Sequence, residues 1–298
     1  MLEHISRSRG DKALDIANLT FLSIVMIAIL YPLLFVIIAS ISDPRLIYED
    51  PLLLWPKALN VESYKLVFEN AAIWTGYRNT VLYTFVGTLI NLALTTMGAY
   101  PLSRRDFWGK GVFTFFFAFT MFFNGGLIPL YILVRNLGMM NTMWAMVIPG
   151  AVSVYNMIIM RTYFQTRIPA HLEDAARIDG CTNFNLLFKV VLPLSMPIIA
   201  VMVLFYGVGH WNQFFNGMIY LTERSRYPLQ LILREILVQN EMTNMLAIAH
   251  DDQYAERMVA KMGLRFAVII VSTLPIFVIY PLLQRFFREG ILVGAIKG

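Results

Sequence analysis

The stretch from Ala17 to Ser40, ANLTFLSIVMIAILYPLLFVIIAS, contains no Asp, Glu, Lys or Arg. A helix needs about 20 apolar residues to cross the hydrocarbon core of a bilayer, and this run is long enough. It is about twice as long as the apolar region of a signal peptide, and no small-x-small cleavage pattern ends it. We therefore expect residues 17–40 to stay in the protein as its first transmembrane helix.

Five more apolar segments of similar length follow along the chain, at 80–102, 112–134, 142–160, 194–217 and 265–284. None carries a charged residue in its central part, as expected where each buried charge costs at least about 2.5 kcal/mol. Only 14% of all residues are charged, whereas a soluble domain has roughly 25%. The sequence predicts an all-α polytopic membrane protein with six transmembrane helices.

The positions of the basic residues predict the orientation of the chain. If the N-terminus lies inside, the inner segments hold 13 of the 24 basic residues, and long outer loops weigh little in the positive-inside rule. We expect helical stretches in the outer loops, such as Leu229 to Val238, to cap the bundle. The expected layout is a cytoplasmic tail at 1–16, an extracytoplasmic loop at 41–79, a core at 80–284 with an inner loop at 161–193 and an outer loop at 218–264, and a cytoplasmic tail at 285–298.

The inner loop and its exit into the membrane, residues 168–197, have the sequence IPAHLEDAARIDGCTNFNLLFKVVLPLSMP. This pattern predicts two short helices joined by a turn. Pro169 suits a first helical position, and Gly180 suits the left-handed residue that ends a helix. Thr182 can then cap the second helix.

Two faces of this helical pair are distinctive. On the first helix, Leu172, Ala175, Ala176 and Asp179 lie three or four residues apart, which gives a face with small residues that another protein can approach closely. The second helix is expected to place Phe184, Leu187 and Phe188 on one side before it enters the membrane at Pro193.

The loop resembles the EAA loop of ABC importer permeases, in which Glu-Ala-Ala is followed by three residues, Gly, and a later Leu-Pro. Here the pattern is Asp174-Ala175-Ala176, Gly180 and Leu192-Pro193, with Cys181 where the family often has alanine. Because Asp replaces Glu and Glu173 precedes it, the sequence leaves open which carboxylate contacts the ATPase. The resemblance implies a type I ABC importer transmembrane domain whose coupling residues are Glu173, Asp174, Ala175, Ala176, Asp179 and Gly180.

The resemblance also implies the assembly in which the chain works. In that family the permease sits in the cell membrane and pairs with a second, related permease. Two cytoplasmic ATP-binding subunits bind ATP and Mg, so this chain is expected to hold no cofactor of its own. A solute-binding protein delivers the substrate from outside.

The stretch from Pro169 to Pro197 and the flanking helices resemble the carbohydrate-uptake branch, close to the second permease of maltose-type systems, and this resemblance covers roughly residues 75–290. Three further stretches are similar to the subgroup that handles complex, often uronate-containing oligosaccharides: 124–129, 211–216 and 228–235. The implied function is oligosaccharide uptake, and import of another small solute is the alternative.

Polar and aromatic side chains at membrane depth are candidates for the sugar pathway, because aromatic faces stack on sugar rings and amides bind hydroxyls. Broken membrane helices often mark such a path, and the Gly125-Gly126 pair interrupts the third helix. The competing interpretations are close helix packing by these glycines, an interfacial anchor at Trp211, and an interhelical hydrogen bond at Asn156. The candidates are Asn124, Tyr131, Tyr155, Asn156, Trp211, Asn212 and Asn216.

Other function classes find little support. The chain has no Walker A or His-Glu-x-x-His motif, so it is expected not to be an enzyme. The one candidate cluster, His250, Asp251 and Asp252, is expected to be a solvated loop. An ion-coupled transporter would need charged residues inside the membrane. The chain has no run of five or more basic residues, so its charge pattern does not indicate nucleic-acid binding.

Overall fold

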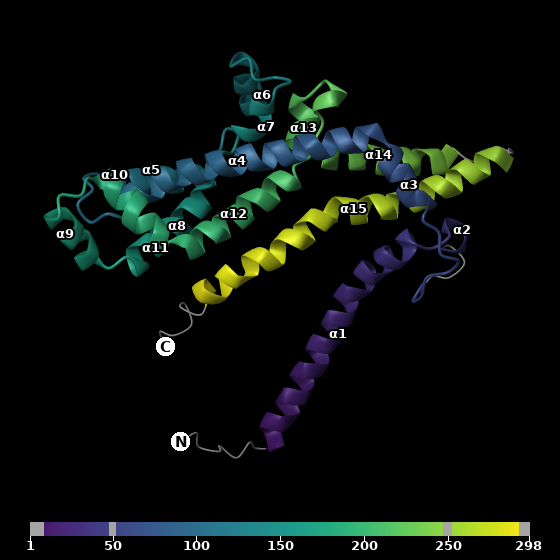
Figure 1. Ribbon diagram of the computed structural model, residues 1–298, viewed down its shortest axis with the longest axis horizontal. Coiled ribbons are helices and arrows are strands. Elements are labelled where there is room, and N and C mark those ends of the chain that lie inside the picture. The colour runs from purple at the N-terminus through teal and green to yellow at the C-terminus, as the bar shows by residue number, and fades with distance from the viewer. Residues whose placement is uncertain (1–8, 48–51, 247–251, 292–298) are drawn as a thin grey trace. The chain divides into compact units, whose positions relative to one another are not determined.

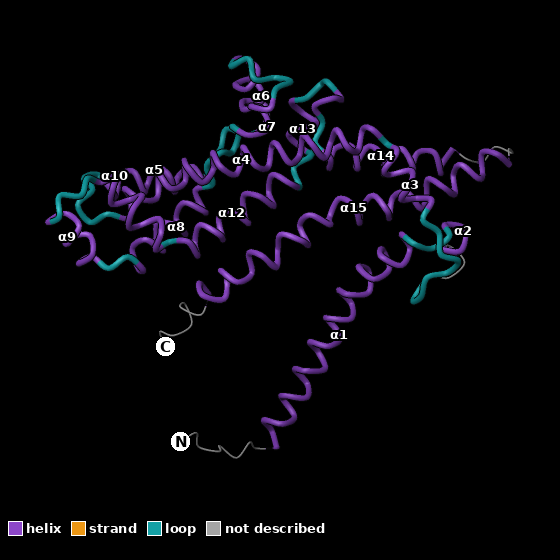
Figure 2. Tube along the Cα trace, viewed as in Figure 1, coloured by secondary structure: helices purple, strands orange, loops and turns teal. Residues whose placement is uncertain are grey.

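The computed structural model describes residues 9–47, 52–246 and 252–291, which form helices and loops and no strand (Figure 1, Figure 2). The all-α prediction is confirmed for this part of the chain. A π-helical turn at Leu187–Val191 and a 3-10 turn at Arg224–Arg226 interrupt the α-helices. The α-helices are α1 Arg9–Ser40, α2 Pro44–Ile47, α3 Glu62–Glu69, α4 Ala71–Ser103, α5 Lys110–Phe122, α6 Leu127–Asn136, α7 Met143–Val147, α8 Val154–Arg167, α9 Ala170–Ile178, α10 Asn183–Leu186, α11 Leu192–Leu194, α12 Met196–Trp211, α13 Phe215–Tyr220, α14 Leu229–Leu246 and α15 Asp252–Ile291.

Three uninterrupted helical stretches are long and apolar enough to cross a bilayer: Gly10–Ser40, Ala71–Ser103 and Gly263–Pro281. Two further spans are bent pairs. The axes of α5 and α6 differ by 111°, and the axis of the helical segment Asn183–Leu194 differs from that of α12 by 82°. The described residues therefore contain three spans, or five if each bent pair counts as one, and the predicted number of six is not confirmed.

The segment 142–160 differs most from the prediction of one continuous helix. It contains the short α7 and the first half of α8, separated by residues 148–153. Pro149 cannot donate a backbone hydrogen bond, and Gly150 has φ +77°, a left-handed conformation that ends a helix. The Ser153 hydroxyl then accepts a hydrogen bond from the Asn156 N–H and caps α8.

The chain divides into two compact units, and each is described by itself. The first comprises the residues up to Asn70 together with Ile236–Ser272. Its described core is a small cluster. In it Phe35 of α1 meets Phe266 of α15 edge to face, with ring centroids 5.9 Å apart, near buried Ala39 and Ile47. Most large apolar side chains of α1 are exposed within the chain, as suits a helix whose surroundings are lipid.

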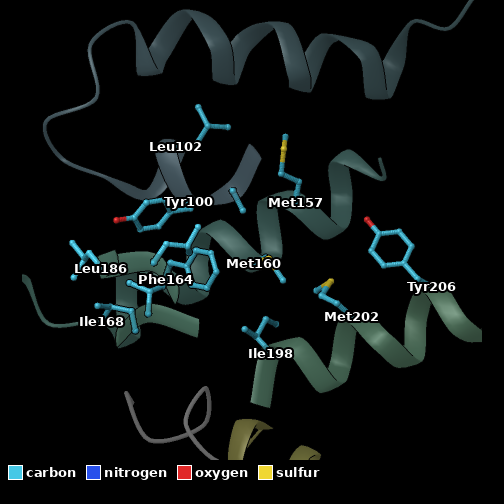
Figure 3. Packing of buried hydrophobic residues seen from close by; sticks show 13 residues of the cluster. Tyr100, Leu102, Met157, Met160, Phe164, Ile168, Leu186, Ile198, Met202 and Tyr206 are labelled. Atoms are coloured by element: carbon cyan, nitrogen blue, oxygen red, sulfur yellow. The ribbon is translucent and has the colours of Figure 1, made fainter. Parts of the chain in front are cut away.

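The second unit comprises Ala71–Glu235 and the residues from Thr273 onward. In it α4, α8 and α12 pack along one another (Figure 1). Figure 3 shows their buried core, to which α4 contributes Tyr100 and Leu102 and α12 contributes Ile198 and Met202. From α8 come Met157, Met160 and Phe164, and Ile168 and Leu186 extend this core to the loop that follows α8.

Hydrogen bonds from buried polar side chains of α4 hold neighbouring segments to it. Thr95 and Tyr206 of α12 share a hydrogen bond at 2.6 Å. Near its N-terminal end, Asn79 donates to the carbonyls of Ser225 and Tyr227, and Tyr83 donates to that of Arg226. These bonds satisfy polar groups that lipid could not.

At Gly87 the ring of His210 in α12 lies directly against α4, in the space where a side chain would begin. A Cβ on Gly87 would lie 2.4 Å from His210 Nε2 and 2.6 Å from Cε1. Relief requires the ring to swing away, which breaks its contact with Gln213 at 3.4 Å.

We predict that Gly87→Ala destabilises the second unit by about 1–3 kcal/mol, the usual cost of overpacking a helix interface. The matched control is Gly209→Ala in α12, where a Cβ meets nothing within 4 Å. Thermal unfolding of the purified protein in detergent should show a lower Tm for the first variant alone. Equal Tm values for both variants would show that the contact between α4 and α12 accommodates an added methyl group.

Candidate coupling site

The loop between α8 and α12 folds as the two short helices that its sequence predicts. α8 ends at Arg167, and Pro169 lies in extended conformation directly before α9. Pro169 is thus the residue before the helix and not its first residue, a shift of one position. Its fixed φ of −65° nevertheless suits the start of a helix.

Gly180 makes the turn between the two helices, with φ +77°. The N–H of Cys181 bonds to the Ala176 carbonyl at 2.9 Å, and that of Gly180 bonds to the Arg177 carbonyl at 3.0 Å. Thr182 accepts a hydrogen bond from the Asn185 N–H and caps α10. The predictions for Gly180 and Thr182 are confirmed, and both reflect standard helix-end chemistry.

The second helix continues into the membrane span through a distorted stretch. The π-helical turn Leu187–Val191 precedes Pro193, which has no backbone N–H to donate. The helical segment then turns by 82° into α12 around buried Ser195. α9 is therefore connected to α12 by a helical, sharply bent segment.

The exposed face of α9 differs in part from the predicted one. Asp174, Ala175 and Ile178 are exposed, and Ile178 is 87% exposed. Ala176, predicted on that face, instead packs against the core of the second unit. Sequence reasoning missed Ile178, although it follows Asp174 by four residues and Ala175 by three, the spacing of one helical face.

On α10 and the π-helical turn, Phe184 and Phe188 form an exposed stacked pair with centroids 6.5 Å apart. Leu187 was predicted on the same side and this is wrong, because Leu187 is buried in the core. The π-helical turn that begins at Leu187 changes the helical register there.

Two ion pairs connect α9 to the chain directly after α4. Arg104 Nη1 lies 2.5 Å from Glu173 Oε1, and Arg177 pairs with Asp106. Arg104 also lies 3.6 Å from Asp106. Glu173 is 21% exposed and held by its own chain, whereas the neighbouring Asp174 is exposed and has no ion pair among the described residues. Apart from the charges themselves, no pattern in the sequence predicts this network.

Residues 71–224 match the family described as the binding-protein-dependent transport system inner membrane component. The chain belongs to this family. It is therefore a membrane-spanning permease subunit of a binding-protein-dependent transporter, and not an enzyme.

Relatives and a solved structure agree with this membership over nearly the whole permease. Protein LplC of Bacillus subtilis is 34% identical over 98% of this chain and 97% of its own length. The polygalacturonan/rhamnogalacturonan transport system permease protein YtcP of the same organism is 33% identical over 97% and 99%. A chain from a bacterial ABC transporter involved in the import of the acidic polysaccharide alginate superimposes with a TM-score of 0.84, at 32% identity, over 94% of this permease and 99% of that chain.

The break in the third predicted helix lies at residues 123–126 of the permease. The Asn124 carboxamide accepts a hydrogen bond from the Gly126 N–H, and Gly126 has φ +82°. A Cβ on Gly126 would meet nothing within 4 Å in this chain, so backbone conformation and not close packing requires glycine there. Beyond the break, Tyr131 stacks on Tyr220 with centroids 6.3 Å apart.

The remaining pathway candidates lie in different surroundings. Tyr155 is exposed, and Asn156 is buried. Asn212 is exposed, donates to the Val208 carbonyl at 3.0 Å, and lies 3.5 Å from Gln230. Asn216 is half-buried. Their contact with a sugar stays a prediction.

Trp211 is buried against Tyr77 at the edge of an apolar groove of about 440 Å³ between α4, α12 and α15. Thr84, Thr88 and Pro275 also line this groove, but its surface is almost entirely apolar. Sugar sites need convergent hydrogen-bonding groups, so the groove itself does not fit a sugar.

No group of three His, Cys, Asp or Glu that could hold a metal occurs within residues 9–47, 52–246 and 252–291. The cluster considered from sequence includes His250 and Asp251, which lie outside the described residues.

The ion pair between Asp106 and Arg177 is sensitive to acid. Its hydrogen bond lowers the pKa of the Asp106 carboxyl and raises the pKa of Arg177. A carboxyl whose pKa is lower in the folded state stabilises that state above its unfolded pKa of about 3.9, and this stabilisation is lost as the pH falls through the folded value.

We predict that Asp106→Asn lowers stability at pH 7 by at most about 1 kcal/mol, because Asp106 is more than half exposed. The difference in Tm between wild type and variant should persist at pH 5 and close below about pH 4. Asp179→Asn, an exposed carboxylate without an ion pair among the described residues, is the matched control. A difference in Tm between wild type and Asp106→Asn that does not change with pH would contradict the assignment of this effect to the Asp106–Arg177 ion pair.

Proposed function

We propose that the permease is one of two related membrane subunits of an ATP-driven importer, and that α9 and α10 dock onto a cytoplasmic ATP-hydrolysing subunit. Both termini then lie on the cytoplasmic side with this loop. The distribution of basic residues supports this orientation. ATP and Mg bind to the ATPase subunits and not to this chain.

The observation that carries the proposal is a set of exposed side chains on successive short helices, which we call the docking surface: Asp174, Ala175 and Ile178 on α9, and Phe184 and Phe188 in the helical segment that follows. Phe184 is 76% exposed and Phe188 is 61% exposed. Exposed large apolar residues beside a charge mark interaction sites when they lie outside lipid. The small Ala175 lets a partner approach the helix closely, and the exposed Asp174 suits a cation on that partner.

The docking surface fits a coupling role because of its connections. α9 contacts the chain after α4 through ion pairs and is joined to α12 by the bent helical segment. ATP binding would close the two ATPase subunits and move the loop. The helices would then swing between inward-open and outward-open arrangements, with a solute-binding protein delivering substrate from outside.

The substrate that we propose is an oligosaccharide, of the acidic, uronate-containing class. Support comes from two similar proteins: the polygalacturonan/rhamnogalacturonan permease and the importer of alginate. Alginate is an acidic polysaccharide, and polygalacturonan and rhamnogalacturonan both contain galacturonic acid.

We predict that cells carrying the intact importer take up labelled oligogalacturonate, and that excess unlabelled oligogalacturonate competes whereas neutral maltooligosaccharide does not. Deletion of the permease should abolish this uptake. If only the neutral sugar competed, the acidic substrate class would be wrong, whereas the proposed import function would still hold.

The docking proposal is tested by Ile178→Asp, which puts a charge on the docking surface without touching the core. The ATPase subunits should no longer copurify with the tagged permease, because a buried unpaired charge disfavours the interface. The control is Leu137→Asp, an equally simple change at an exposed leucine just after α6. Copurification of the ATPase with Ile178→Asp at the wild-type level would show that α9 does not dock there.

A further inference from the structure

We propose that Arg104 is a positioning residue that, together with Asp106, clamps α9 to the end of α4, so that the two move together when the transporter changes state. The inference rests on the proposed function, because it concerns how movement of the docking surface reaches the membrane helices. It assigns a role to residues that lie outside the EAA-like pattern.

Arg104 is placed as the fixed point of the clamp. It follows the last residue of α4 and is only 7% exposed. Its guanidinium lies 2.5 Å from Glu173 and 5.7 Å from the centre of the Tyr100 ring, one turn earlier in α4. A buried guanidinium requires a charged or hydrogen-bonding partner, so Glu173 and Arg104 constrain each other.

A second ion pair gives the clamp a second point of contact. Glu173 and Arg177 lie four residues apart on one face of α9, and they meet Arg104 and Asp106 with opposite charges. Arg104 and Asp106 also lie 3.6 Å from each other. One ion pair would let α9 pivot about a point, whereas two pairs a helical turn apart resist both rotation and sliding.

The end of α4 is itself held by α8, which gives the clamp a firm base. Arg161 Nε donates to the Leu102 carbonyl at 3.1 Å, and Gln165 Nε2 donates to the same oxygen at 3.4 Å. Lys110 Nζ donates to the Arg104 carbonyl at 3.2 Å. These donors satisfy carbonyls that the C-terminus of a helix leaves unpaired.

Movement of α9 therefore has two routes into the membrane. One follows the backbone through the bent helical segment at Pro193 and Ser195 into α12. The other passes through the ion pairs directly into α4, without that bend. Because α4 packs against both α8 and α12, the second route would move these three helices together.

The experiment uses the assembled importer in proteoliposomes and measures oligosaccharide transported per ATP hydrolysed. We expect Glu173→Gln to retain the ATPase subunits at the wild-type ratio and to lower transport per ATP about tenfold, a typical size for lost coupling between sites. Glu223→Gln, which removes an ion pair with Arg226 elsewhere in the second unit, should leave this ratio unchanged.

Two further variants guard against a Glu173→Gln protein that fails to fold. Arg104→Lys keeps a cation but loses the planar fork that reaches two carboxylates, and should lower the ratio less than Glu173→Gln does. Asp106→Asn removes the ion pairs of Asp106 with Arg177 and Arg104 but keeps the one between Arg104 and Glu173, and it should also lower the ratio. A purely stabilising role would change the yield of intact complex but not transport per ATP.

The clamp is overturned if all three variants transport at the wild-type ratio with their ATPase subunits bound. Loss of these subunits from Glu173→Gln would also overturn it, since Glu173 would then belong to the docking surface. If instead Ile178→Asp retains the ATPase, the docking proposal fails, and this outcome is separate from the ratio measured for Glu173→Gln.

Discussion

Hydrocarbon offers no hydrogen-bond partner, and this constraint governs where the second unit places its polar groups. Along α4, Asn79, Tyr83 and Thr95 each bond to another segment of the same chain. Charged side chains gather where the helices end, as at Arg104 and Glu173. Because charges are costly in hydrocarbon, the ionic contacts lie outside the apolar core of the helices, at the loop that carries α9. There they can connect segments that move.

The coupling site combines local and long-range requirements. Gly180 and Thr182 build the turn between α9 and α10 from helix-end chemistry alone. Placement of α9 against the bundle depends on residues about 70 positions away in sequence, at the end of α4. The family's sequence pattern includes the residue that makes the turn, Gly180. The placement of α9 depends instead on the ion pairs with Arg104 and Asp106.

This difference explains how far the sequence could predict the structure. Apolar run length predicted the first span, and local propensity predicted the Gly180 turn and the Thr182 cap. The break within 142–160 was missed because apolar content outweighed the Pro149-Gly150 pair. The packing of Ala176 against the core, the burial of Leu187 and the pairing of Glu173 with Arg104 depend on tertiary contacts that no local pattern encodes.

The buried seam between α8 and α12 contains Met157, Met160 and Met202 where a rigid bundle would favour branched aliphatic residues. Methionine is unbranched and polarisable, so it fills differently shaped gaps by rotating about its own bonds. Neighbouring helices can therefore shift without opening voids or forcing clashes. The same thioethers become polar when oxidised to sulfoxides, so oxidation of these three residues would disrupt the packing between the helices on which such movement depends.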